Sequence, residues 1–192
     1  MISVQTRYGV CEAQEAVTYQ LTLFVRQGRR LGLLPVGNKE FGDDYDWENN
    51  LLEGLRDGLI DGGGQCLSLD LSDFEEENFA ESLLAELESA RTTYPQRINL
   101  PLARSSSPFI HRAIAWQRLC DRLIEDEDPQ RPTLLIIENF DQANESARCD
   151  VERLIRFHIA HNIRRTFLLT VAEDTNLQRP SLLRLVDFRI ER

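Results

Sequence analysis

The distribution of apolar and polar residues predicts strands and helices in regular succession. Short apolar runs are typical of strands buried on both faces, and apolar residues three or four positions apart are typical of amphipathic helices. Strands are predicted at 31–36, 65–71, 133–137, 166–171 and 188–190. Helices are predicted at 12–26, 47–60, from a capping box at 72–75 to about 91, at 108–125, 145–162 and 180–185. This alternation predicts an α/β fold with a largely parallel sheet and helices on both faces.

Length and composition suit one globular domain. The chain has 192 residues, of which 42% are hydrophobic, and this is enough for a sizeable core. No apolar run reaches 18 residues, and the N-terminus has no basic segment followed by an apolar one, so we expect neither a membrane span nor a signal peptide. Four scattered cysteines without a CxxC pair favour reduced thiols and a cytoplasmic location.

The charge is strongly negative, with a formal net charge of −10, and Lys39 is the only lysine. Such a chain is a poor non-specific nucleic-acid binder, because attraction to phosphates supplies most of that affinity. Two arginine-rich stretches keep a nucleic-acid or acidic-partner contact open: Arg148, Arg153, Arg156, Arg164 and Arg165, and Arg26, Arg29 and Arg30. Because Asp150 and Glu152 interrupt the larger stretch, ion pairs along a helix are the favoured interpretation.

The strand that begins at Thr133 ends in an abrupt polar cluster. Glu138, Asn139 and Asp141 follow its apolar run. Ligands of open α/β sheets bind just beyond the carboxyl ends of such strands. These three side chains therefore stand where chemistry is expected.

The order and lengths of the elements resemble the α/β core of AAA+ P-loop ATPases, with the origin-recognition and initiator-like group the most similar. A helix precedes the strand within 29–34, residues 37–42 occupy the place of the phosphate loop, and 138–142 follow the strand of the Walker B motif. Residues 166–171 resemble the strand that leads to the sensor, and 179–190 resemble the segment that often carries an arginine finger. The resemblance covers about 12–191. It implies a three-layer sandwich with a mainly parallel five-stranded sheet of the P-loop NTPase type, as one domain over 1–192 without the family's helical lid.

The phosphate loop departs from the family pattern GxxxxGK[ST]. Gly37 and Gly42 keep the glycine spacing, but Asp43 stands at the lysine position and Asp44 at the hydroxyl position. One carboxylate about 4 Å from a phosphate costs about 4 kcal/mol at an effective dielectric constant of about 20. Lys39 lies inside the loop rather than on the following helix. We expect an ordinary strand-to-helix turn, with the aspartates capping the helix and no triphosphate bound in the usual way.

The Walker B and sensor positions depart as well. Glu138 could reach a metal, but Asn139 at the glutamate position cannot act as a base, and Asp141 lies two residues further on. Glu173 and Asp174 stand at the sensor position in place of the usual asparagine. Loss at three separate sites indicates a pseudoenzyme, so no catalytic residue is assigned.

Metal chemistry is the alternative. An acidic cluster could bind a divalent cation: Asp43, Asp44, Glu138, Asp141, Glu173 and Asp174. Acidic surface loops are ordinary in a chain of this charge, so no metal or other cofactor is predicted. His158 and His161 have helical spacing without an evident third ligand and favour a helix-surface pair, while His111 is isolated.

The function predicted from these features is that of an inactive ATPase-like adaptor or regulatory subunit that binds a protein. The partner would be an AAA+ ATPase or further copies of the chain, in a DNA-transaction or defence complex, with Arg184 and Arg189 facing it. Two alternatives stay open: an NTPase with a non-standard phosphate loop, and a metal-dependent enzyme using the acidic cluster.

Overall fold

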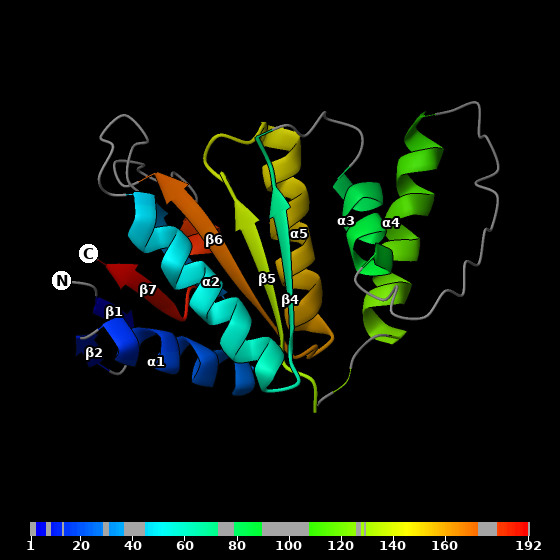
Figure 1. The fold of residues 1–192 in the computed structure, drawn as a ribbon. Coiled ribbons are helices and arrows are strands. Elements are labelled where there is room, and N and C mark those ends of the chain that lie inside the picture. Colours follow the sequence, from blue (N-terminus) through cyan, green and yellow to red (C-terminus); the bar gives the residue numbers. More distant parts are fainter. Residues whose placement is uncertain are drawn as a thin grey trace.

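The fold is described from a computed structural model. It describes residues 3–6, 9–12, 14–28, 31–36, 45–72, 79–89, 108–125, 128, 130–172 and 180–191. Figure 1 shows a central sheet with helices on both sides.

One sheet organises the described part of the chain, in the order β2-β1-β7-β3-β6-β5-β4. Its strands are β1 (Ser3–Thr6), β2 (Gly9–Glu12), β3 (Leu31–Val36), β4 (Gln65–Asp70), β5 (Thr133–Glu138), β6 (Arg165–Ala172) and β7 (Phe188–Glu191). The strands β7, β3, β6, β5 and β4 are parallel, while β1 is antiparallel to both β2 and β7. The expected α/β fold with a mainly parallel five-stranded sheet is confirmed, and the β1–β2 hairpin is an addition that the sequence analysis did not predict.

The helices match the predicted ranges to within a few residues, except that the described part of α3 begins at Phe79, and most of the predicted capping box at 72–75 lies outside the described residues. They are α1 (Gln14–Arg26), α2 (Tyr45–Asp61), α3 (Phe79–Ser89), α4 (Pro108–Glu125), α5 (Glu145–Ala160) and α6 (Pro180–Leu183). Helix α5 ends two residues earlier than predicted, because Asn162 adopts a left-handed φ of 55° and Ile163 N–H donates to His158 O at 3.0 Å. None of the described helices is long and apolar enough to cross a membrane.

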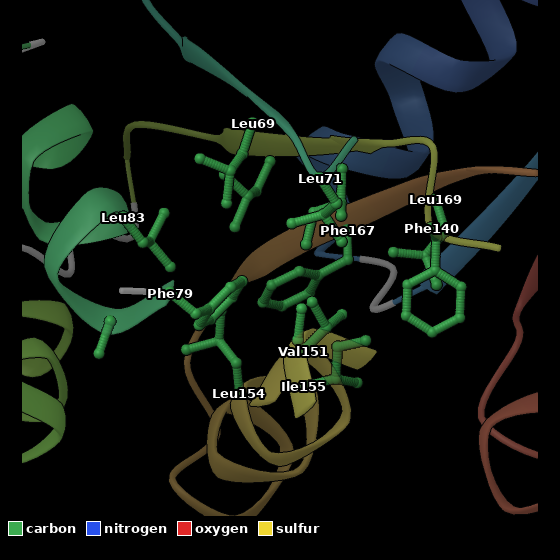
Figure 2. Close-up of a cluster of buried hydrophobic side chains, with 14 of the residues drawn as sticks. Leu69, Leu71, Phe79, Leu83, Phe140, Val151, Leu154, Ile155, Phe167 and Leu169 are labelled. Atoms are coloured by element: carbon green, nitrogen blue, oxygen red, sulfur yellow. The ribbon is translucent and has the colours of Figure 1, made fainter. Parts of the chain in front are cut away.

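Two hydrophobic clusters hold the layers together. On one face, Leu21 and Val25 of α1 and Leu55 of α2 pack with Leu134 and Ile136 of β5. On the other face, α3 to α6 cover the alternate strand residues, as Figure 2 shows around Phe79, Phe140, Leu154 and Phe167. Because β5 contributes to both clusters, its continuous apolar run is explained.

The crossovers explain which helix covers which face. The β3–α2–β4 connection moves across the sheet in one direction, and the β5–α5–β6 connection moves back. Right-handed crossovers in opposite directions place their helices on opposite faces. Because β3, β4, β5 and β6 are parallel, their carboxyl ends lie at one end of the sheet.

Pro35 limits the pairing of β3. Leu31 O accepts from Asp187 N at 2.8 Å, so Leu31 and every second residue after it face β7. Pro35 is one of these residues and has no N–H to donate. The registered pairing of β3 with β7 covers only Gly32 and Leu33.

Candidate functional site

The candidate site is the carboxyl end of the parallel sheet. The structure describes the ends of β4, β5 and β6 there, together with the turn from β5 to α5. Several predicted site residues lie outside the described residues: Gly37, Lys39, Gly42, Asp43, Asp44, Glu173 and Asp174. Glu138, Asn139 and Asp141 lie within the described residues and contact the neighbouring strands.

Glu138 is bound to the neighbouring strand β4. Its carboxylate oxygen Oε1 accepts a hydrogen bond from the Ser68 hydroxyl, and its backbone O accepts from Leu71 N at 3.1 Å. Its register partner is Asp70, the last residue of β4. The Glu138 carboxylate therefore helps to join β5 to β4.

Asn139 connects three strands. Its backbone adopts a left-handed φ of 55°, a conformation that asparagine tolerates better than most residues. Its N–H donates to Thr170 Oγ1 of β6 at 3.0 Å, and its side-chain Nδ2 donates to Asp70 Oδ1 of β4 at 2.7 Å. The same Asp70 oxygen accepts from Ser72 N at 2.9 Å. The Asn139 side chain and backbone therefore hold the ends of β4, β5 and β6 together.

Asp141 fastens the next part of the turn to β6. Its Oδ1 accepts from Ala172 N at 3.2 Å, while the fully buried Phe140 donates its N–H to Thr170 O at 3.1 Å. Asn144 then caps α5 by accepting from Ala147 N at 2.8 Å. The turn that follows β5 is therefore fixed to β6 and leads directly into α5.

The described part of this end offers no metal cage. Asp70, Glu138 and Asp141 each accept a hydrogen bond from a donor of the scaffold itself. Among the described residues, no group of three or more His, Cys, Asp or Glu side chains is arranged to hold a metal ion. Of the predicted acidic cluster, only Glu138 and Asp141 lie within the described residues, and the other four members lie outside them.

The predicted histidine pair is divided between two environments. His158 is buried and its ring contacts Phe167 edge-on, with the ring centroids 4.8 Å apart. Its Nδ1–H donates to Leu154 O at 2.8 Å, which leaves Nε2 to accept from Arg165 at 3.3 Å. Burial is the main cause that lowers the pKa of His158 to about 3, and the Arg165 charge acts in the same direction. The expectation of a surface pair is wrong for His158, because its ring packs into the core, while His161 is exposed and donates to Phe157 O at 2.9 Å.

The arginines of α5 are engaged mainly with their own scaffold. Arg148 pairs with Glu145 at 3.3 Å and Arg156 with Glu152 at 3.8 Å. Arg153 lies over the Trp116 ring of α4 at 4.2 Å from the centroid. These contacts agree with the favoured interpretation of helix ion pairs.

Arg184 and Arg189 are exposed but do not lie at the carboxyl end. Arg184 follows α6, where its N–H donates to Pro180 O at 3.2 Å. Arg189 lies in β7 opposite Leu33 and Gln5. Arg184 and Arg189 therefore precede and lie in β7, which β3 and β6 separate from β5 and Asn139 in the sheet.

Sequence reasoning missed the residues that Glu138 and Asn139 contact, which are Ser68, Asp70 and Thr170. Each is a polar residue near the carboxyl end of a strand next to β5. The sequence predicted strands at 65–71 and 166–171 but not that they lie on either side of β5. What was missing was the register that brings these three side chains to the same level.

Negative charge is concentrated in the connections that leave this end. The segments 37–44, 71–78, 139–144 and 173–179 link β3, β4, β5 and β6 to the helices that follow. Together they contain ten Asp or Glu residues and only two basic residues, Lys39 and Arg179. The four connections therefore carry a formal net charge of −8, from ten acidic and two basic residues, against −10 for the whole chain.

Comparisons with known proteins agree with this topology. No protein-family model and no curated protein matches the sequence. A chain in the structure of Drosophila ORC bound to DNA is 14% identical, with a TM-score of 0.54 over 91% of this chain and 85% of that chain. The Aeropyrum pernix ORC2 protein, in ADPNP–ADP complexes, is 15% identical, with a TM-score of 0.53; 92% of this chain is covered, but it spans only 45% of that one. At these identities the likeness concerns the fold: the chain has the α/β fold of AAA+ P-loop ATPases.

Proposed function

We propose that this chain is a catalytically inactive ATPase-like domain that acts as an adaptor or regulatory subunit through protein–protein interaction. The observation that carries the proposal is the state of Asn139. An ATPase of this fold needs a carboxylate there to activate water, and an amide has no basic oxygen of comparable strength. The Asn139 amide is instead bound to Asp70 at 2.7 Å.

Two further features support inactivity. Asp43 and Asp44 stand where a phosphate loop has its lysine and hydroxyl residues, so the loop carries charge of the wrong sign for a triphosphate. Asp141 accepts from Ala172 N, which makes it a poor substitute for the missing base. The proposal therefore assigns no catalytic residue and no cofactor.

The partner in this proposal is a protein, either an AAA+ ATPase or further copies of the chain. Support comes from fold likeness to a chain of Drosophila ORC, an assembly whose structure is bound to DNA. The exposed Arg184 and Arg189 are the residues proposed to face the partner. A DNA-transaction or defence complex in the cytoplasm is the proposed setting, with the partner rather than this acidic chain supplying the main contact with nucleic acid.

Calorimetric titration of the purified chain with ATP and with GTP, in the presence of Mg²⁺, tests inactivity. We expect no binding heat above that of dilution. Micromolar affinity for either nucleotide would overturn the proposal and favour an NTPase in which Lys39 serves an altered loop. A thermal shift on adding Mn²⁺ that disappears in Glu138→Gln would instead favour the metal-dependent alternative.

Light scattering coupled to size-exclusion chromatography tests the partner. The chain is measured alone and mixed with AAA+ ATPases from its own host. A defined complex that dissociates in Arg184→Ala or Arg189→Ala, while Arg156→Ala leaves it intact, supports the proposed surface. A chain that stays monomeric and binds none of these ATPases contradicts the adaptor proposal.

A further inference from the structure

We infer that Asp70 and Asn139 form a strand-end clamp, which holds the residue after β5 in its left-handed conformation. The clamp also disfavours a carboxylate side chain at position 139. The clamp is a conformational device of the fold. It is independent of whether the chain binds a nucleotide, since it concerns only how β4, β5 and β6 end.

The clamp begins with a backbone that needs support. Asn139 has a φ of 55°, which is unfavourable for residues with a Cβ atom and least so for asparagine and aspartate. Its carbonyl accepts from Gln142 N at 3.0 Å and from Ala143 N at 3.1 Å. The left-handed residue therefore directs the chain from the end of β5 toward the cap of α5.

Side chains on both neighbouring strands hold this residue. Thr170 of β6 is buried and its Oγ1 accepts the Asn139 N–H, while Asp70 of β4 accepts from Nδ2. Asn139 thus bridges the two strands that lie on either side of β5. Removing either acceptor takes away the bond that Asn139 itself makes to that strand, while the bonds of Glu138 to β4 and of Phe140 and Asp141 to β6 stay in place.

The direction of the Asp70–Asn139 bond is fixed by a third residue. Asp70 Oδ1 also accepts from Ser72 N, so the carboxylate is held in place by its own chain and presents an acceptor to Asn139. Position 139 must therefore supply a donor. Aspartate there would tolerate the same backbone but would place two carboxylates in contact, and glutamate would bring a second negative charge to the same group.

Position 139 cannot hold the clamp and supply a catalytic base at the same time. Replacing Asn139 by glutamate, the residue expected for catalysis in this fold, would disrupt the clamp as well as add a base. The structural role of position 139 and a catalytic role are mutually exclusive as long as Asp70 is present.

Urea unfolding of four variants and the wild type tests the clamp. Asn139→Gly keeps the left-handed backbone and loses only the side-chain bond. We expect Asn139→Asp, which adds repulsion, to raise the unfolding equilibrium constant about tenfold more than Asn139→Gly. In Asp70→Asn/Asn139→Asp, the amide introduced at position 70 donates to the carboxylate at position 139, and its oxygen still accepts the Ser72 N–H. This double variant should return to within about threefold of the wild type, and Asp70→Asn alone should be mild because two amides still pair.

Two results would overturn the clamp: an Asn139→Asp variant as stable as Asn139→Gly, or a double variant as unstable as its two single changes combined. If Asn139→Asp does not fold, the unfolding free energies of Asp70→Ala, Asn139→Gly and their combination test the clamp instead. Because both changes remove the same bond, their combination should cost no more than the larger single effect. Fully additive effects would contradict the inference.

Discussion

The two ends of the parallel sheet are built differently. The connections that enter the strands at the amino end, 27–30, 62–64, 126–132, 161–164 and 184–187, contain four acidic and five basic residues, whereas the carboxyl-end connections contain ten acidic and two basic ones. At the amino end, the described turns are closed by backbone hydrogen bonds and close packing. At the carboxyl end, they are also joined by polar side chains, of which Thr170 is buried while Glu138, Asn139 and Asp141 are partly exposed.

The turn from α2 to β4 illustrates the amino end. Gly64 N donates to Leu59 O at 2.7 Å, and Gln65 N donates to Pro132 O at 2.8 Å. Backbone atoms therefore surround Gly64 and leave no room for a side chain. We therefore expect substitutions at the amino end to destabilise the chain through steric clashes with the backbone, and those at the carboxyl end to act through lost side-chain hydrogen bonds and charge repulsion.

The largest effect is expected for Gly64→Ala. A Cβ atom there would lie 2.8 Å from Pro132 O and 2.9 Å from Leu59 O, and neither backbone oxygen can move without breaking the turn. We expect a loss of about 3 kcal/mol or more in the free energy of unfolding, measured in urea. The matched control is Gly63→Ala, which has open space but a φ of 76° and should cost about 1 kcal/mol. Equal losses in the two variants would contradict this picture of the amino end.

The second largest effect is expected for the pH dependence of stability at His158, which packs beside Arg165 at the start of β6. Its pKa in the folded chain is about 3, against an ordinary value of 6.5, so below pH 6.5 the unfolded chain binds the proton that the folded chain excludes. The stabilisation is complete above about pH 6.5 and is lost as the pH falls toward 3. We expect the stability advantage of the wild type over His158→Gln to shrink by about 1.4 kcal/mol per pH unit in that window. Urea titrations between pH 7 and 4.5 measure it, and an advantage that does not change with pH would contradict the buried environment.

A smaller effect is expected at the junction of α4 and α5. Arg112 donates to Asp150 at 2.6 Å and to Ser146 at 2.9 Å, and Asp150 is nearly buried. Arg112→Met leaves that carboxylate without its cation and should cost about 1–2 kcal/mol of unfolding free energy. Gln117→Met on the same helix removes only an exposed bond to Asp121 and should change stability by less than about 0.5 kcal/mol. A loss no larger than that of the control would show that the pair is fully hydrated.

The smallest effect is expected for Glu138→Gln at the carboxyl end. A glutamine Oε1 can still accept the Ser68 hydroxyl, so the bond between β5 and β4 survives the loss of charge. We expect a change of less than about 0.5 kcal/mol by urea unfolding. A larger gain in stability would indicate that charge repulsion, rather than hydrogen bonding, dominates this end of the sheet.

The fold could be predicted from the sequence because its central strands β3, β5 and β6 are buried on both faces. The strand β5 shows as a continuous apolar run, and the helices α4 and α5 show as apolar residues three or four positions apart. Both patterns can be read from the residue types alone. The β1–β2 hairpin was missed because four-residue strands carry little periodic signal. The burial of His158 could not be foreseen either, since helical spacing gives its angle on α5 but not what packs against it.

The candidate site could be located but not assembled. Position and spacing identified Glu138, Asn139 and Asp141 as the residues at the strand end. Their partners depend on register: Asp70 meets Asn139 only because β4 pairs with β5 in the observed alignment. A left-handed φ at Asn139 leaves no clear mark in a single sequence, because asparagine is also common in ordinary turns.

The most direct test of the central claim is paired calorimetry with Mg²⁺ and ATP on the wild type and on Asp43→Lys/Asp44→Thr. The second protein restores the residue types of a phosphate loop and leaves the Asp70–Asn139 clamp intact. We predict no binding by the wild type, and no hydrolysis by either protein because position 139 still has no base. Micromolar binding by the wild type, or ATP turnover by either chain, would contradict the account.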